Sequence, residues 1–93
     1  MKRKHDDLIL TIHALSAQER LQILLLLKKR AHCVCEIQKE LNLNQTGASN
    51  HLSVLYKAQL IEPKQVNRFR YYNLSDNYKE LILEIETIFK NSE

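Results

Sequence analysis

The stretch from residue 35 to residue 60 constrains the fold of this chain most strongly. Ile37 and Leu41 lie four residues apart, which places them on one face of a helix. Asn44 follows a break in this pattern, and its side chain can accept the free N–H groups of a first helical turn. The stretch therefore predicts two short helices joined by a tight turn.

The second of these helices has two contrasting faces. One side carries Ala48, Leu52 and Leu55. The other side carries short, polar and uncharged residues, namely Gln45, Thr46, Ser49, Asn50 and Ser53. Such a helix suits the major groove of DNA, although a plain helical hairpin in a small bundle has the same spacing. Gly47 inside the helix indicates a close approach, to the preceding helix or to the DNA backbone.

The residues that follow favour the DNA-binding interpretation. Segments 60–65 and 69–74 are rich in β-branched and aromatic residues and predict a hairpin, with Asn67 in the left-handed conformation at its tip. Pro63 cannot donate to a ladder, so its nitrogen should lie outside the pairing. Basic residues surround the tip, namely Lys64, Arg68 and Arg70. A basic ribbon after a polar-faced helix predicts a winged helix-turn-helix, with the wing on the DNA backbone or minor groove.

Apolar spacing predicts three further helices. One covers residues 5–15, and a second covers 17–30, which is apolar nearly all round and should be the central core helix. Ser16 and Glu19 should form a capping box at the start of this second helix. The last helix, residues 76–91, repeats apolar residues in a pattern close to a coiled-coil seam and predicts a dimer contact through Leu81, Ile85, Ile88 and Phe89. The expected fold is mainly α with a small β-hairpin (α+β): five helices plus a two-stranded wing.

Length and composition exclude several classes of protein. With 93 residues, one Gly and one Pro, the chain should form one domain, residues 1–93. Its net charge of +3 is compatible with a nucleic-acid partner. The longest apolar run, Ile23–Leu27, is far shorter than the ~18 residues of a membrane span. Two cysteines one residue apart make no secreted disulfide framework, and no secretory signal precedes them, so we expect a cytoplasmic protein. No convergent acid, base and nucleophile are present, so we expect no enzyme.

The order of these elements resembles the arsenic-repressor-type (ArsR/SmtB) family of winged helix-turn-helix transcriptional regulators. The resemblance covers nearly the whole chain and is carried by residues 14–24, 33–37, 49–55 and 70–74. It implies a homodimeric repressor with DNA-contacting residues on the helix from Gln45. It also implies dimer contacts from the first helix, through Leu8 and Ile12, and release from DNA when an inducer binds. A two-fold protein of this kind would bind a palindromic double-stranded operator.

The segment Cys33–Ile37 resembles the thiolate box of the arsenic, lead and cadmium sensors in that family. Two thiolates fit soft, thiophilic ions. On a regular helix, residues two apart point about 200° away from each other, so both thiols reach one ion only if Cys33 precedes the helix or the ion distorts the first turn. Gln38 stands where arsenic sensors often carry a third Cys. Further ligands could come from residues that would favour zinc, namely His5, Asp6 and His32.

Other interpretations stay open. The cysteines could be inert packing residues, or a thiol switch that forms an intersubunit or mixed disulfide, because a disulfide between residues two apart would be strained. The zinc and nickel sensors of the family use ligands on the last helix, but Tyr78 and Phe89 here stand at the expected His positions, so Asp76 alone makes no metal site. A winged helix that binds protein instead of DNA is the remaining rival.

Overall fold

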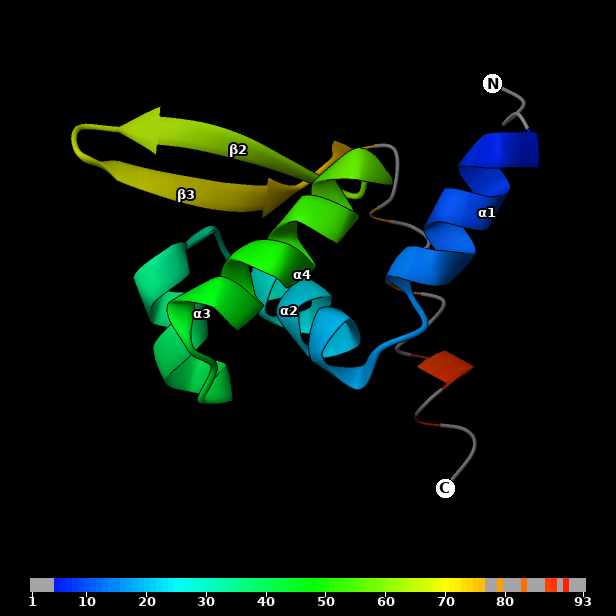
Figure 1. The fold of residues 1–93 in the computed structure, drawn as a ribbon, viewed down its shortest axis with the longest axis horizontal. Coiled ribbons are helices and arrows are strands. Elements are labelled where there is room, and N and C mark those ends of the chain that lie inside the picture. The colour runs from blue at the N-terminus through cyan, green and yellow to red at the C-terminus, as the bar shows by residue number, and fades with distance from the viewer. Residues whose placement is uncertain (1–4, 77–78, 80–82, 84–86, 89, 91–93) are drawn as a thin grey trace.

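The structure is a computed structural model, and it describes residues 5–76 together with residues 79, 83, 87, 88 and 90. Its elements are α1 (His5–Ala14), α2 (Gln18–Lys29), β1 (His32–Cys33), α3 (Val34–Leu41), α4 (Gln45–Lys57), β2 (Ile61–Val66) and β3 (Phe69–Leu74). Figure 1 shows the β2–β3 wing extending to one side of the helices, with α1 on the opposite side.

The expected class, a winged helix-turn-helix of α+β type, is confirmed, with two corrections to the count. Within the described part of the chain there are four helices instead of five, and the sheet has three strands instead of two. The predicted last helix, 76–91, falls largely outside the described residues, although residues 79, 83, 87, 88 and 90 are each helical. No helix formed by the described residues is long and apolar enough to cross a membrane.

The sheet is antiparallel, and β3 lies at its centre in the order β1-β3-β2. The wing closes through a two-residue turn between the paired residues Val66 and Phe69. Asn67 in this turn has a φ of 57°, which confirms the predicted left-handed conformation. Pro63 lies on the edge strand β2 and pairs with Tyr72 of β3. In an antiparallel ladder hydrogen-bonded and non-hydrogen-bonded pairs alternate, and counted from the turn this pair is a non-hydrogen-bonded one, so Pro63 needs no N–H donor.

The third strand, β1, was not expected from the sequence. It consists of His32 and Cys33, which pair with Tyr72 and Tyr71 of β3. Two residues of this kind carry too weak a local pattern to predict a strand, and the partner strand lies almost forty positions further along the chain. The sheet therefore joins the wing to the start of α3.

The core lies between α2, the helix-turn-helix pair α3–α4 and the base of the sheet. Ala48, Leu52 and Leu55 are buried on one side of α4, as the spacing predicted. Ile23 and Leu24 of α2 are likewise buried, and α2 packs against α3, α4 and β3. The most completely buried large side chains are Ile23, Leu24, Ile37, Leu52, Leu55, Leu60 and Ile61. This core fixes which face of α4 is turned to solvent.

The helix termini confirm one predicted cap and correct another. Asn44 is the N-cap of α4, where its Oδ1 accepts the N–H of Gly47 at 2.6 Å. A Cβ added at Gly47 would lie 3.1 Å from that same Oδ1, so the close approach is to the cap and not to the preceding helix. The predicted capping box of Ser16 and Glu19 is wrong: α2 has Ala17 as its N-cap, without a side-chain bond, and the Ser16 hydroxyl donates to the His13 carbonyl at 2.6 Å.

Candidate nucleic-acid interface and thiol pair

The polar face of α4 is open to solvent. Its predicted DNA-contacting residues are all exposed, namely Gln45, Thr46, Ser49, Asn50 and Ser53. They are held there because Ala48, Leu52 and Leu55 are buried on the other side of the same helix. The first turn carries no acidic residue, so no side-chain charge of this turn repels a phosphate backbone. The face can both donate and accept hydrogen bonds.

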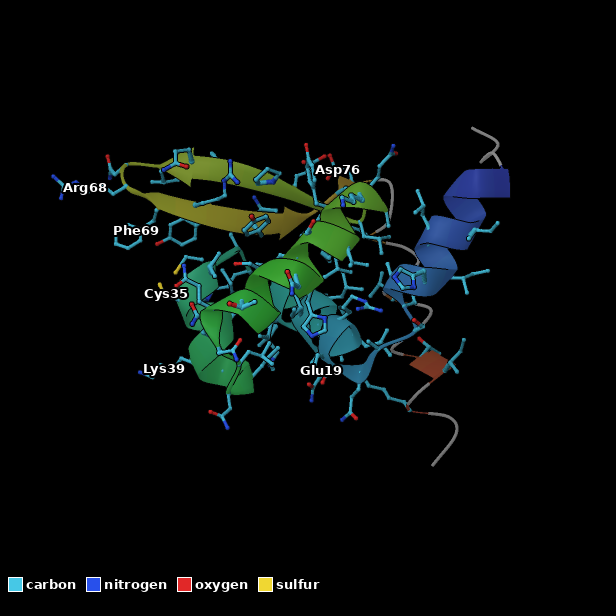
Figure 2. All side chains as sticks on the ribbon, viewed as in Figure 1. Glu19, Cys35, Lys39, Arg68, Phe69 and Asp76 are labelled. Carbon is cyan, nitrogen blue, oxygen red and sulfur yellow. The ribbon has the colours of Figure 1, made fainter. Side chains whose placement is uncertain are left out.

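The basic residues of the wing are open to solvent. Lys64, Arg68 and Arg70 are exposed, and Figure 2 shows Arg68 at the far tip of the hairpin. Arg70 also lines a groove of about 400 Å³ between α4 and the wing, together with Ser49 and Ser53. The structure thus brings Ser49 and Ser53 of α4 and Arg70 of the wing to one groove, which Lys64 and Arg68 do not line.

Tyr56 is a residue of this groove that the sequence interpretation missed. Its side chain is 55% exposed and lines the groove opposite Arg70 and Pro63. The sequence pattern indicated this, because Tyr56 lies seven residues after Ser49 and three after Ser53, on the same side of α4. Near the wing tip, Val66 and Phe69 form a second overlooked feature, an exposed apolar cross-strand pair.

Cys33 and Cys35 meet at the start of α3. Cys33 is the N-cap of that helix and therefore precedes it, while Cys35 is the second helical residue. Both are free cysteines, Cys33 buried and Cys35 exposed, and their Sγ atoms are 2.7 Å apart. Figure 2 shows Cys35 on the side of α3 that lies beneath the wing. Burial, followed by the hydrogen bond with Cys35, raises the pKa of the Cys33 thiol.

A carboxylate holds the backbone at this thiol pair. Oε1 of Glu36 accepts the backbone N–H of Cys33 at 3.0 Å, and Oε2 lies 3.1 Å from Nη2 of Arg30. The Cys33 N–H and then the Arg30 guanidinium lower the pKa of Glu36 to about 2. Glu36 is therefore an ionised capping residue at the N-terminus of α3, where the helix dipole favours negative charge.

The other proposed ligands lie apart from this pair or outside the described side chains. His32 is buried, and its Nδ1 donates to the Arg30 carbonyl at 2.8 Å. Across the described part of the chain, no three His, Cys, Asp or Glu side chains form a group that could hold a metal ion. The side chains of His5 and Asp6 are not described, and Asp76 forms an ion pair with Lys79 at 2.9 Å.

The predicted dimer residues are only partly described. Ile12 is 67% exposed on α1, next to the exposed Ile9 and Leu10, and Ile88 is 65% exposed. The side chain of Leu8 lies outside the described set, as do Leu81, Ile85 and Phe89. An apolar strip on α1 is thus open to solvent in the single chain.

Comparison with known proteins identifies the family. A sequence model described as "bacterial regulatory protein, arsR family" matches residues 17–62. An arsenical resistance operon repressor of Bacillus subtilis is 36% identical over 68% of this chain and 61% of its own length. A transcriptional repressor SmtB homolog of Synechocystis is 29% identical over 70% of this chain and 49% of its own length. The chain thus spans about half to three fifths of these two relatives.

Two further relatives match over more of their length. An uncharacterized HTH-type transcriptional regulator of Methanocaldococcus jannaschii is 35% identical over 74% of this chain and 80% of its own. Among solved structures, the homodimeric winged helix-turn-helix DNA-binding domain of a possible ArsR-family regulator from Mycobacterium bovis superposes with a TM-score of 0.87. It is 26% identical and covers 94% of this chain and 82% of that one. These matches are to regulators and not to enzymes, as the sequence predicted. The chain belongs to the arsR family of bacterial regulatory proteins.

Proposed function

We propose that this chain is a homodimeric, sequence-specific DNA-binding transcriptional repressor that an inducer releases from its operator. The observation that carries the proposal is the groove that Ser49 and Ser53 of α4 line together with Arg70 of the wing. Uncharged polar side chains can hydrogen-bond base edges, while Arg and Lys side chains contact phosphates. The relatives named as repressors support the same role.

The exposed apolar strip of α1 supports a dimer. Ile9, Leu10 and Ile12 would leave water if a second copy covered them, and a two-fold dimer would bind a palindromic duplex. The homodimeric relative from M. bovis supports this arrangement. The proposed interface comprises Leu8, Ile12, Leu81, Ile85, Ile88 and Phe89. Sedimentation equilibrium should give twice the mass of the chain, and a monomer mass at all concentrations would refute the dimer.

For the inducer we propose a thiophilic metal or metalloid ion (arsenic, cadmium, lead or zinc) bound by Cys33 and Cys35. The two Sγ atoms are close enough to bind one ion because Cys33 precedes α3. Soft thiolates favour such ions. Binding must displace the thiol protons, so a raised pKa at Cys33 makes the first attachment easier at the exposed Cys35. His32 remains a candidate third ligand only if the ion reorganises its hydrogen bond to Arg30.

The same contact favours a second candidate, a thiol-redox switch. Peroxide would oxidise the exposed Cys35 thiol to a sulfenic acid with release of one water. The 2.7 Å contact favours attack on that sulfur by the Cys33 thiol, with release of a second water, so the disulfide would form within the chain, despite its strain, in place of the intersubunit or mixed disulfide that the spacing predicted. In this candidate the two cysteines lose two electrons to the peroxide.

Two variants test the DNA-binding part. Asn50→Ala should weaken binding to a duplex that the wild-type chain selects from a random library, because it removes a group proposed to contact bases. Arg68→Ala should weaken all duplexes alike and lower the salt slope by about one, because it removes a phosphate contact. Fluorescence anisotropy at several salt concentrations measures both. Absence of salt-dependent binding to any duplex would refute DNA binding and favour the protein-binding alternative.

Release from the selected duplex tests the inducer. Reduced protein bound to this duplex is titrated separately with arsenite, Cd²⁺, Pb²⁺, Zn²⁺ and peroxide, beside a Cys33→Ser/Cys35→Ser variant. We expect one metal or metalloid to release DNA from the wild type and not from the variant. Release by peroxide alone would select the redox candidate. Equal behaviour of the two proteins toward every agent would show that the cysteines are not the sensor.

A further inference from the structure

Arg20, near the start of α2, is a charged side chain that the fold buries. The residue is 8% exposed, and its Nε donates to the Ala14 carbonyl at 2.9 Å while Nη2 donates to the His13 carbonyl at 2.9 Å. These carbonyls belong to the last two residues of α1, beyond the regular hydrogen bonds of the helix; the His13 carbonyl also accepts the N–H and the hydroxyl of Ser16. A cation there also matches the negative end of the helix dipole. Arg20 therefore closes the C-terminus of α1.

The same guanidinium reaches α4. Its Nη1 lies 3.3 Å from Nδ1 of His51, a half-buried residue in the middle of that helix. A guanidinium has donors only, so Nδ1 must accept, and the neutral imidazole carries its proton on Nε2. Nη2 also donates to the Ser16 hydroxyl at 3.3 Å. One side chain thus bridges the end of α1, the loop before α2 and the centre of α4.

The charge of Arg20 has no carboxylate partner within the described residues. A buried cation is costly unless its donors are satisfied, and here the partners are two carbonyls, a hydroxyl and an imidazole. An apolar residue would fill the same space without needing hydrogen-bond acceptors. The arrangement therefore indicates a role in fixing geometry between the three elements.

His51 lies at an informative place on α4. It follows Asn50 on the exposed side and precedes the buried Leu52, so it stands at the edge between the two faces. α1 and α2 both pack against α4. A hydrogen bond at this edge resists rotation of α4 about its own axis. Such a rotation would displace the exposed polar side chains relative to the base edges in a DNA major groove.

We propose that Arg20 and His51 are positioning residues for sequence recognition: their hydrogen bond ties α4 to the C-terminus of α1. The inference rests on the proposed DNA-binding function. Hydrogen bonds to base edges depend on distance and direction, whereas phosphate contacts of a wing tolerate small displacements. Loss of the tie should therefore reduce preference for the selected duplex and leave binding to unrelated duplex intact. Because α1 carries the exposed apolar strip, the tie also connects the proposed dimer contact with α4.

Paired variants at each end of the bond provide the test. His51→Gln keeps an oxygen acceptor, His51→Leu removes it, and Arg20→Lys keeps the charge but loses the forked donors. Gln22→Leu, on the exposed side of α2, is the matched control. Anisotropy measures the affinity of each for the selected duplex and for a scrambled duplex of the same composition. Hydrogen exchange of the α4 amides, without DNA, measures how firmly the helix is held.

We expect His51→Leu and Arg20→Lys to lower the ratio of selected to scrambled affinity by about tenfold, the effect of one hydrogen bond to a charged group. Scrambled-duplex affinity should change by less than about twofold, since the wing contacts remain. His51→Gln should restore most of the ratio, and the double variant His51→Leu/Arg20→Lys should lose no more than either single variant. Amide exchange in α4 should be faster in the two variants that lack the bond.

Other results would overturn the inference. If His51→Gln lost as much preference as His51→Leu while Arg20→Lys bound like the wild type, His51 would contact DNA on its own account. An equal fall for selected and scrambled duplexes would indicate a folding defect instead of a positioning role. If the wild type bound no duplex, the proposed function would fail, and unchanged amide exchange in the variants would then separately refute the tie.

Discussion

Two helix termini in this molecule are capped by charged side chains, one in the interior and one at the surface. At the C-terminus of α1, Arg20 binds carbonyls inside the protein and is 8% exposed. At the N-terminus of α3, Glu36 binds the Cys33 N–H and pairs with Arg30, and these two side chains are 34% and 60% exposed. In both places the charge complements the helix dipole. Only the second is accessible to solvent and to an inducer.

This difference in exposure separates rigidity from responsiveness. A buried, fully bonded charge is costly to rearrange because each lost partner leaves a polar group without water. An exposed ion pair contributes little and exchanges readily with solvent. The tie to α4 therefore sits at the rigid end, and the proposed sensing thiols sit at the adaptable end. The following variants test that contrast, from the largest expected effect to the smallest.

Arg20→Leu should have the largest effect. It removes the donor to the Ala14 carbonyl and to the His51 nitrogen, while the His13 carbonyl keeps its bonds from Ser16, so the free energy of unfolding should fall by about 3 kcal/mol. Urea denaturation followed by circular dichroism measures this. Arg30→Leu at the exposed end is the matched control and should cost less than about 1 kcal/mol. Equal losses would remove the distinction between the two ends.

Asn44→Ala should have an intermediate effect. Asn44 caps α4 through a single hydrogen bond to Gly47, and it is exposed. Loss of an N-cap of this kind costs about 1 kcal/mol. The same urea titration measures it, with Asn44→Asp as a control that keeps the acceptor and should be near wild type. A loss as large as that of Arg20→Leu would show that burial is not what makes the α1 terminus costly to disturb.

Glu36→Gln should have the smallest effect at neutral pH, because the amide oxygen can still accept the Cys33 N–H and only the charge is lost. Its signature lies in the pH dependence. The folded pKa of about 2 is below the ordinary value of 4.5, so the carboxylate stabilises the fold above pH 4.5 and this contribution disappears between pH 4.5 and 2. As the pH is lowered through that range, the melting temperature should fall more steeply in the wild type than in Glu36→Gln. Parallel curves would contradict the assigned cap.

Local rules of sequence predicted much of this fold. Asn44 and Asn67 were identified as a cap and a left-handed turn residue because each depends only on its own side chain and its immediate neighbours. The buried side of α4 followed from helical spacing for the same reason. The face proposed to bind DNA is the complement of that buried side, so it was predictable too.

Long-range contacts account for what the sequence did not predict. The bond between Arg20 and His51 joins residues 31 apart, and β1 pairs with a strand that follows two helices later. The capping box at Ser16 failed because α2 begins after Ala17, and the Ser16 hydroxyl is used to close α1 instead. At Cys33 the residue type concealed the cap, since a thiol is a weak acceptor and Cys is not a usual cap residue, although its side chain and that of Glu36 form a capping box.

The two-residue strand β1 has a consequence for kinetics. Cys33 pairs with Tyr71, which is next to Arg70 on the same strand of the wing. A chemical change at Cys33 would thus act on the part of the molecule proposed to hold phosphates, and such contacts are the same on every DNA sequence. We expect an inducer to shorten the lifetime of the complex on all duplexes while the order of sequence preference stays the same. Dissociation rates measured on several duplexes should therefore all rise by the same factor when inducer is added.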